Sequence, residues 1–286
     1  MKIVKYFLEF IFIISFFFIF KIIGYKNASN LGAIIGKKLG PYFRSSSKIE
    51  ENLKVSNIGN SDEERKFIIS NMWSNYGRIL SEYVFLKQFR KNILSKFLEI
   101  EGLELLEKIK RDSEQVVFIS GHFNNFELMA MEIEKAGLNL CAIYRPLNNP
   151  FLNIIMEKIR KNYICKNQIK KGKSGTRELI KLFKKNYSAA LMIDQRVSEG
   201  KNIHFFGKKA KTTTIPAQLI KKYNCKIVPV YVERIKNQNF KIYFKNPIKF
   251  DDNLSIEQIS LELNKILEKM ILKNPDQWIW SHDRWK

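Results

Sequence analysis

The second half of the chain alternates between short apolar runs and segments with helical periodicity. Strand-like runs occupy 114–120, 138–144, 187–194, 225–234 and 240–250, and helical patterns occupy 126–137, 150–163, 174–186, 216–224 and 255–272. Strands that alternate with amphipathic helices favour a parallel sheet, because each helix carries the chain back to the same end of the sheet. The pattern therefore predicts an α/β fold with a largely parallel sheet.

The start of the chain has a different pattern. Residues 6–20 are apolar apart from Glu9 and Ser15, and lysines flank both ends. With Ile22 and Ile23 the segment approaches the ~20 residues that cross a bilayer. A signal peptide and an ordinary buried helix are the alternatives, but no A-x-A cleavage pattern follows the apolar run. The pattern predicts an uncleaved membrane anchor whose orientation the flanking charges leave open.

The region between these two parts is predicted to be mainly helical. Its apolar residues recur at helical intervals, and Ser61 before Glu64 is typical of a capped helix N-terminus. The predicted organisation is an anchor over 1–25, a helical part over 26–110 and an α/β core over 111–286.

The chain is strongly basic, with a formal net charge of +22, and 157–185 holds eleven Lys/Arg against two Glu. Such a field favours anionic partners, although a general richness in Lys, Ile and Asn explains part of it. No helix-turn-helix, zinc-finger or RNA-binding pattern supports nucleic acid as the partner. Cys141, Cys165 and Cys225 lack metal-site or disulfide spacing and are expected to be buried residues of the core.

One histidine stands at a position where chemistry is expected. His122 follows the strand 114–120 and Gly121, Glu127 lies five residues later, and Asp194 ends another predicted strand. Polar residues at the carboxyl ends of parallel strands gather at one edge of the sheet. His122 and Glu127 can meet only if the histidine lies in the strand-to-helix turn, with Asn124 or Asn125 as the helix cap. The alternative is a buried structural histidine. H-E-x-x-H and G-x-S-x-G patterns are absent.

Five ordered blocks resemble one family of enzymes. They are "GHFNNFE" (121–127), "YRPLNNPFLN" (144–153), "MIDQ" (192–195) with "FFGKKAKTTTIPA" (205–217), "IVPVYVER" (227–234) and "PDQWIWSHDRWK" (275–286). Together they are similar to the lipid A biosynthesis (late, lauroyl/myristoyl-type) acyltransferases of the lysophospholipid/glycerolipid acyltransferase superfamily. Asn124 stands where the family usually has Gly, and Phe126 where it often has Trp. Both departures are expected to reshape the substrate pocket.

The resemblance implies a glycerol-3-phosphate-acyltransferase-like sheet flanked by helices, and a reaction. A fatty acyl group would pass from an acyl carrier protein thioester to a hydroxyl of a phosphorylated glycolipid, a Kdo-bearing lipid A precursor. His122 would act as general base, oriented by Glu127. No metal, cofactor or protein nucleophile is implied. The implied location is the bacterial inner membrane, with the catalytic part on its cytoplasmic, anionic face.

Five further residues are expected to bind substrate: Arg145, Asn149, Asp194, Gln195 and Thr213. Arg145 offers a planar fork of donors to phosphate or carboxylate. Structural roles, such as turns and helix caps, are the alternatives for the others. His282 with Arg284 is expected to be structural, and the Trp residues of the tail are expected either in the core or at the membrane interface.

Two other functions remain compatible with the motifs. One is acyl transfer to another membrane lipid, such as a lysophospholipid, an ornithine lipid or a mannosylated lipid. The other is a non-catalytic, membrane-anchored basic protein, for which removal of His122 would change nothing.

Overall fold

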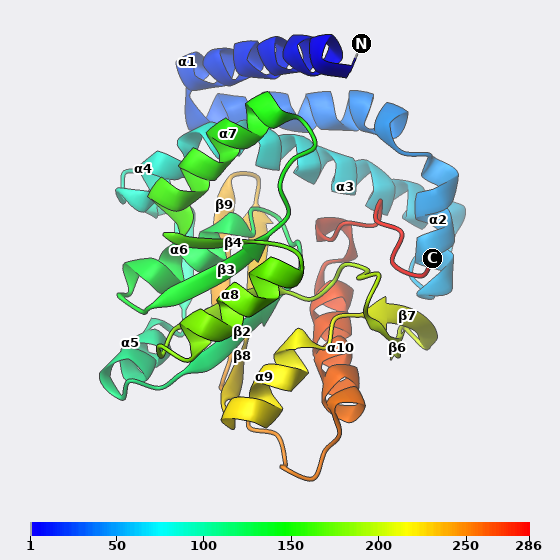
Figure 1. Cartoon of the computed structure of the whole chain (residues 1–286). Coiled ribbons are helices and arrows are strands. Elements are labelled where there is room, and N and C mark those ends of the chain that lie inside the picture. The colour runs from blue at the N-terminus through cyan, green and yellow to red at the C-terminus, as the bar shows by residue number, and fades with distance from the viewer. Residues whose placement is uncertain (1) are drawn as a thin grey trace.

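A computed structural model describes residues 2–286 (Figure 1). Seven strands form the main sheet in the order β1-β9-β8-β2-β5-β3-β4, and β6 and β7 form a separate hairpin. The strands are β1 Leu98–Glu101, β2 Val116–Ser120, β3 Leu140–Tyr144, β4 Asn167–Lys170, β5 Ser188–Met192, β6 Lys201–Phe205, β7 Lys208–Thr212, β8 Lys226–Lys236 and β9 Asn239–Phe244. All neighbours in the main sheet are parallel except β8 and β9. The prediction of an α/β fold with a largely parallel sheet is confirmed.

The helices surround this sheet. They are α1 Lys2–Phe43, α2 Ser46–Val55, α3 Asp62–Glu82, α4 Leu86–Arg90, α5 Leu103–Arg111, α6 Glu127–Lys135, α7 Pro150–Ile159, α8 Lys173–Phe183, α9 Ile215–Tyr223 and α10 Ile256–Lys273. The predicted cap at Ser61 is confirmed, because its side chain accepts the backbone N–H of Glu64.

Strand β2 shows why the sheet needs cover on both faces. All five of its residues are buried. Val117 and Ile119 belong to one hydrophobic cluster, which includes residues of α8, α9 and α10. Val116 and Phe118 point the other way, into a second cluster with residues of α5 and α6. An almost continuous apolar sequence is what a central parallel strand between two layers requires.

Three strand regions were not predicted from the pattern. Strand β1 lies inside the region expected to be helical and pairs with β9, β4 lies inside the basic segment, and half of the side chains of β6 and β7 are exposed. All four strands are short: β1 and β4 lie at the two edges of the main sheet, and β6 and β7 form the hairpin. Only some of their side chains face the interior, so their apolar signal is weak.

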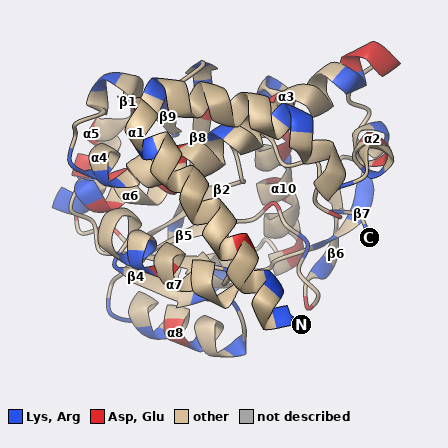
Figure 2. Cartoon of the chain, turned by 90° about the horizontal axis from the view of Figure 1, so that it is seen from above, with Lys and Arg blue, Asp and Glu red and all other residues tan. Residues whose placement is uncertain are grey.

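Helix α1 folds back on itself at Gly24, whose φ of 78° and ψ of 165° are not helical. The two halves diverge from this kink: the first half runs diagonally across one end of the molecule toward α7, and the second half follows α3 (Figures 1 and 2). The second half packs closely on α3, because a Cβ at Gly36 would collide with backbone atoms of Trp73 and Gly77. A buried ion pair joins the end of α3 to the sheet: Arg234 of β8 binds Glu82 at 2.7 Å.

The first half of α1 is the apolar segment predicted as an anchor. Its 18-residue window of highest hydropathy averages 2.3 and is only 11% buried. Figure 2 shows a largely uncharged ribbon from the N-terminus to the kink. Phe7 lies edge-on to Phe151 of α7, with ring centroids 5.6 Å apart. This long apolar helix with little cover fits membrane association.

Candidate active site

His122 lies in the turn between β2 and α6, as the sequence predicted. The next strand in the sheet, β5, ends at Met192, and Asp194 follows it. Because β2 and β5 are parallel neighbours, the residues that follow them lie at the same edge of the sheet. The sheet therefore brings together two side chains that are 72 positions apart in the chain.

Asp194 holds His122 in one orientation. Its Oδ1 lies 2.8 Å from His122 Nδ1, and its Oδ2 accepts the backbone N–H of His122 at 2.8 Å. The indole N–H of Trp278 also donates to Oδ2, at 2.9 Å. An ionised carboxylate only accepts hydrogen bonds, so the Nδ1 proton lies toward Asp194. Nε2 has no hydrogen-bond partner within residues 2–286, and His122 lines a cavity.

The surroundings make His122 a stronger base than a free imidazole. Burial alone disfavours the imidazolium, but the carboxylate of Asp194 and its hydrogen bond outweigh burial and raise the pKa of His122 above its usual value. Burial likewise disfavours the Asp194 carboxylate, yet His122 and Trp278 lower its pKa to about 2. The pair is arranged to stabilise a protonated histidine beside an ionised aspartate.

This geometry corrects the predicted role of Asp194. It was expected to bind substrate, but its side chain is fully buried and its oxygens bind His122 and Trp278. Without exposed surface it has no access to a substrate. It contacts His122 on the side of the ring that faces away from the cavity.

Glu127 also differs from expectation. It is the first residue of α6, as predicted, but it makes no hydrogen bond to His122 within the described residues. Its Oε1 instead binds Arg160 at 2.8 Å and accepts the Tyr83 hydroxyl at 3.3 Å. The direct orienting contact predicted for Glu127 is made by Asp194. Glu127 acts on His122 through space, where its charge contributes to the raised pKa of the imidazole.

Arg160 was missed by the sequence analysis. It opens a π-helical turn, Arg160–Ile164, at the end of α7, and such turns often occur at functional sites. Burial disfavours its charge, but Glu127 outweighs this effect and raises the pKa of the guanidinium. The guanidinium also lies 5.4 Å from the ring centroid of Tyr144. An arginine in a basic segment carries no sequence signal that separates it from its neighbours.

The two asparagines after His122 do not cap α6. The cap position is Phe126, whose side chain makes no capping hydrogen bond. The side chain of Asn124 donates instead to Val232 O and to Gln277 Oε1. Asn124 has a φ of 46°, in the left-handed region that Gly favours and Asn tolerates. Its departure from glycine is therefore compatible with the backbone, and it is buried away from the cavity. Phe126 does line the cavity, 4.7 Å from the His122 ring.

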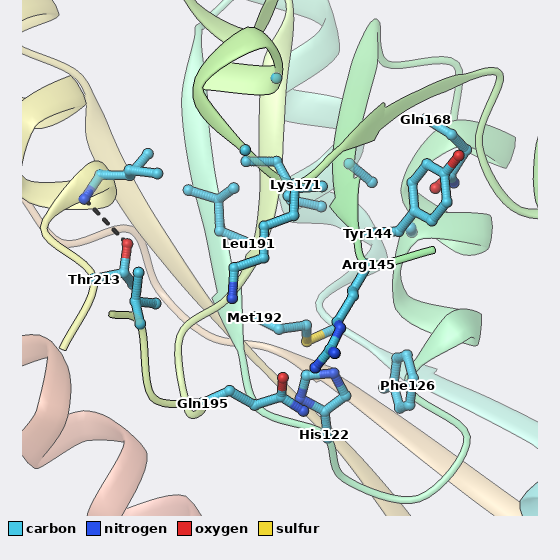
Figure 3. Close-up of a pocket in the computed structure, with 18 of the residues that line it drawn as sticks. His122, Phe126, Tyr144, Arg145, Gln168, Lys171, Leu191, Met192, Gln195 and Thr213 are labelled. Carbon is cyan, nitrogen blue, oxygen red and sulfur yellow. Dashed lines mark hydrogen bonds between the residues drawn. The ribbon is translucent and has the colours of Figure 1, made fainter. Parts of the chain in front are cut away.

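A cavity of about 480 Å³ opens in front of His122 (Figure 3). One part of its wall is apolar and is formed by side chains of α6, β3 and β5 and of the π-helical turn: Met129, Ala130, Ala142, Ile143, Ile164, Ala190, Leu191 and Met192. Another part is basic and includes Arg145, Lys171 and Lys173. Such a mixed wall suits a ligand that has a hydrocarbon chain and an anionic group.

The cavity separates the predicted substrate contacts into two groups. Arg145, Gln195 and Thr213 line it, and Figure 3 shows Arg145 and Gln195 beside His122. Asn149 does not line it. Its Oδ1 caps α7, its Nδ2 donates to Tyr6 O at 2.8 Å, and it is buried, so the structural alternative holds for this residue.

The C-terminal tail supports the site from behind. Trp278 and Trp280 are almost fully buried, which resolves their alternatives in favour of the core. Arg284 is buried and donates to Thr212 Oγ1 at 2.8 Å. His282, expected to be structural, lines the cavity, and its Nε2 accepts the backbone N–H of Arg196 at 3.0 Å. Burial lowers the pKa of His282, which favours its neutral form.

The three cysteines are buried and free, as expected for core residues. Burial raises the pKa of Cys141 and of Cys165 to about 12 and that of Cys225 to about 11. None of these thiols would ionise near neutral pH, so none is suited to act as a nucleophile.

Comparison with known proteins gives concordant results. The model of the family described as bacterial lipid A biosynthesis acyltransferase matches residues 1–286. The chain is similar to the lipid A biosynthesis palmitoleoyltransferase of Escherichia coli (strain K12), with 24% identity over 268 residues, 90% of this chain and 84% of that protein. It is also similar to the lauroyltransferase of the same organism, with 22% identity over 264 residues, 90% of this chain and 84% of that protein.

Among solved structures, the crystal structure of the 1-acyl-sn-glycerophosphate acyltransferase from Thermotoga maritima matches 90% of this chain and 100% of that chain. The TM-score is 0.41 and the sequence identity 11%.

Proposed function

Because this chain belongs to the bacterial lipid A biosynthesis acyltransferase family, we propose that it moves a fatty acyl group from an acyl carrier protein thioester to a hydroxyl of a Kdo-bearing lipid A precursor. Acyl transfer in lipid A biosynthesis follows from the family. The observation that carries the residue-level proposal is the free Nε2 of His122, which lies at a cavity whose wall is partly apolar and partly basic.

In the proposed reaction, His122 Nε2 takes the proton of the acceptor hydroxyl while that oxygen attacks the thioester carbonyl. The tetrahedral intermediate then expels the thiolate, which takes the proton from the imidazolium and leaves as a thiol. Asp194 keeps Nδ1 protonated and stabilises the imidazolium as it forms. One ester forms and one thioester breaks, and the proton ends on sulfur.

Two residues beside His122 have proposed supporting roles. Gln195 lines the cavity next to the imidazole and makes no side-chain hydrogen bond within residues 2–286, so its amide is available to donate to the carbonyl oxygen as negative charge develops there (Figure 3). Glu127 is a positioning residue in this proposal. It fixes Arg160 at the cavity wall and adds negative charge near the imidazolium.

The apolar wall is proposed to hold the fatty acyl chain. Met129, Ala142, Ala190 and Leu191 offer no hydrogen-bonding side chains, and water displaced from them favours a hydrocarbon ligand. The thioester carbon would then lie where this wall meets His122.

The N-terminal helix is proposed to anchor the enzyme in the inner membrane, with the catalytic part on the cytoplasmic face. Support comes from the first half of α1, residues 2–23, which precedes the kink at Gly24 and is about 33 Å long at ~1.5 Å per residue. Its contact with α7, which leads into the Arg160 turn, would keep the cavity close to the lipid phase.

The proposal is tested by acyl transfer in membranes that contain the full-length protein. A labelled Kdo-bearing tetraacyl precursor is incubated with acyl carrier protein thioesters of several chain lengths. Wild type is expected to give a heavier, acylated product, and His122→Ala is expected to lower the rate by about 10²–10⁴-fold. His204→Ala is the matched control, because that side chain is exposed on β6, and it is expected to retain full activity.

The two ways of failing are separate. No product from folded, membrane-inserted wild type with any donor would discard the lipid A acceptor, and lysophospholipids and aminolipids would be assayed next. Product from wild type and His122→Ala at equal rates would keep the reaction but remove His122 from it.

A further inference from the structure

Three cations on the cavity wall have no part in the mechanism above. Arg145, Lys171 and Lys173 line the cavity and form no ion pair within residues 2–286. Lys170, next to them, differs, because it is paired with Glu157 at 3.0 Å. Of the acidic residues on the wall, Glu127 is neutralised by Arg160, and Glu199 is the remaining one. The wall therefore carries an excess of unpaired positive charge.

The sheet explains why these cations gather. Strands β3 and β4 are parallel neighbours, with Tyr144 opposite Lys170. Arg145 and Lys171 are the next residues of each strand, so both extend past the same edge. The backbone N–H of Lys171 donates to Tyr144 O at 2.8 Å, which fixes the two chain segments together. Figure 3 shows both side chains pointing into the space above His122 and Gln195.

The loop between β4 and α8 places the uncapped N-terminus of α8 at the cavity. Gly172 has a φ of 138°, which favours glycine, and it precedes α8 without any capping side chain or acidic residue in the first turn. Gly175 allows α8 to approach β4 closely, because a Cβ there would collide with Lys170 O. Lys171, Gly172, Lys173, Gly175 and Thr176 all line the cavity. The positive end of α8 therefore acts together with the three cations.

We propose that Arg145, Lys171 and Lys173, with the β4–α8 loop, bind a phosphate ester group of a substrate whose reacting atoms lie at His122. This inference rests on the proposed function and specifies its substrate contacts. Guanidinium and ammonium groups at one wall match the charge and the acceptor oxygens of a phosphate. The phosphate has two sources in the proposed reaction: the glycolipid acceptor, or the phosphodiester of the prosthetic arm of acyl carrier protein.

The experiment compares two variants with equal loss of charge. Lys171→Gln/Lys173→Gln removes two cations from the cavity wall, and Lys184→Gln/Lys185→Gln removes two exposed cations from the far end of α8. The full-length proteins are assayed in detergent with the acceptor, with the dephosphorylated acceptor and with varied acyl donor. The cavity variant is expected to raise KM for the phosphate-bearing substrate at least about tenfold, with kcat changed less than about threefold. The control is expected to stay within twofold of wild type.

The substrate arms identify the source. If the acceptor phosphate is bound, KM for the intact acceptor rises in the cavity variant, and the dephosphorylated acceptor shows no difference between variant and wild type. If the donor phosphodiester is bound, the rise occurs in KM for the donor. Equal rises in KM in the cavity variant and the control would overturn the proposal in favour of a general basic field. An unchanged KM for both substrates in the cavity variant would also overturn it.

A second readout separates this proposal from the proposed function. Inorganic pyrophosphate is expected to raise the Tm of wild type and of the control, but not that of Lys171→Gln/Lys173→Gln. If wild type transfers no acyl group to lipid A precursors yet shows this difference in Tm, the anion site stands and the function falls. An equal rise in Tm with pyrophosphate in all three proteins would show that Lys171 and Lys173 do not form the anion site.

Discussion

Two carboxylates, Glu127 and Asp194, lie near His122, but only Asp194 forms hydrogen bonds with it. Glu127 is five residues away in sequence, yet its carboxylate binds Arg160 and Tyr83. Asp194 is 72 residues away, yet it accepts hydrogen bonds from the imidazole and from the backbone N–H of His122. A motif in the sequence pointed to the nearer residue, whereas the neighbouring ends of β2 and β5 bring in the more distant one. Spacing along the chain is therefore a poor guide to which group orients a histidine.

The two carboxylates also differ in what would happen if each lost its charge. Asp194 shapes the protonation of His122 directly, so its loss is expected to affect chemistry more than folding. Glu127 neutralises Arg160 at a position where both side chains are about nine-tenths buried. Its loss is expected to affect folding more than chemistry, because an unpaired buried charge is costly.

The largest expected effect comes from Asp194→Asn. Oδ2 accepts two N–H donors, so the new amide oxygen must take that position and the NH₂ group must face His122 Nδ1. The imidazole proton would then move to Nε2, where the base is needed. We expect kcat/KM to fall by on the order of 10²–10⁴ with the fold intact, measured by acyl transfer and circular dichroism. Asp252→Asn, at an exposed position, serves as the control. Activity within threefold of wild type would show that Asp194 is not the orienting group.

Glu127→Gln is expected to act mainly on stability. Arg160 would lose its charge partner in a mostly buried position, and the free energy of unfolding is expected to fall by roughly 3–5 kcal/mol. Denaturant unfolding measures this change, with Glu104→Gln on the exposed side of α5 as the control. Glu127→Leu/Arg160→Met is expected to recover much of the loss, because it removes both charges. If Glu127→Gln is as stable as wild type but as inactive as Asp194→Asn, the roles of the two carboxylates assigned above are reversed.

The smallest expected effect is a shift in pH dependence. Transfer needs neutral His122, so kcat/KM is expected to fall about tenfold per pH unit below a pKa that is raised above the usual 6.5. The contribution of the His122–Asp194 ion pair to stability depends on pH in the opposite direction to the activity. Because the folded-state pKa of His122 is raised, this contribution is fully present below the unfolded pKa and is lost as pH rises through the folded pKa.

Comparing the variants by pH then ranks the two carboxylates. Glu127→Gln is expected to move the acid limb of kcat/KM to lower pH by less than one unit, and the residual activity of Asp194→Asn is expected to show a larger move in the same direction. An acid limb with its midpoint below the usual 6.5 in wild type would contradict the raised pKa of His122, and a larger shift in Glu127→Gln than in Asp194→Asn would contradict the ranking.

Much of the sheet was predictable because its central strands are buried on both faces. The runs at 114–120, 187–194 and 225–234 became β2, β5 and β8 with small changes of boundary. Strands β1 and β4 were missed because short edge strands expose part of their side chains. The first half of α1 was recognisable from its apolar run, but its position beside α7 depends on contacts between aromatic side chains far apart in the sequence.

The sequence by itself determined the alternation of strands and helices, the apolar N-terminal helix, and the place of His122 after a strand. These features depend on local periodicity and on the residue types that a buried strand or an exposed turn requires. The tertiary structure alone decided that Asp194 orients His122, that Arg160 neutralises Glu127, and that Arg145 and Lys171 face one cavity. The physical reason is that hydrogen bonds and charge pairs act over a few ångströms in space, and the register of neighbouring strands sets those distances.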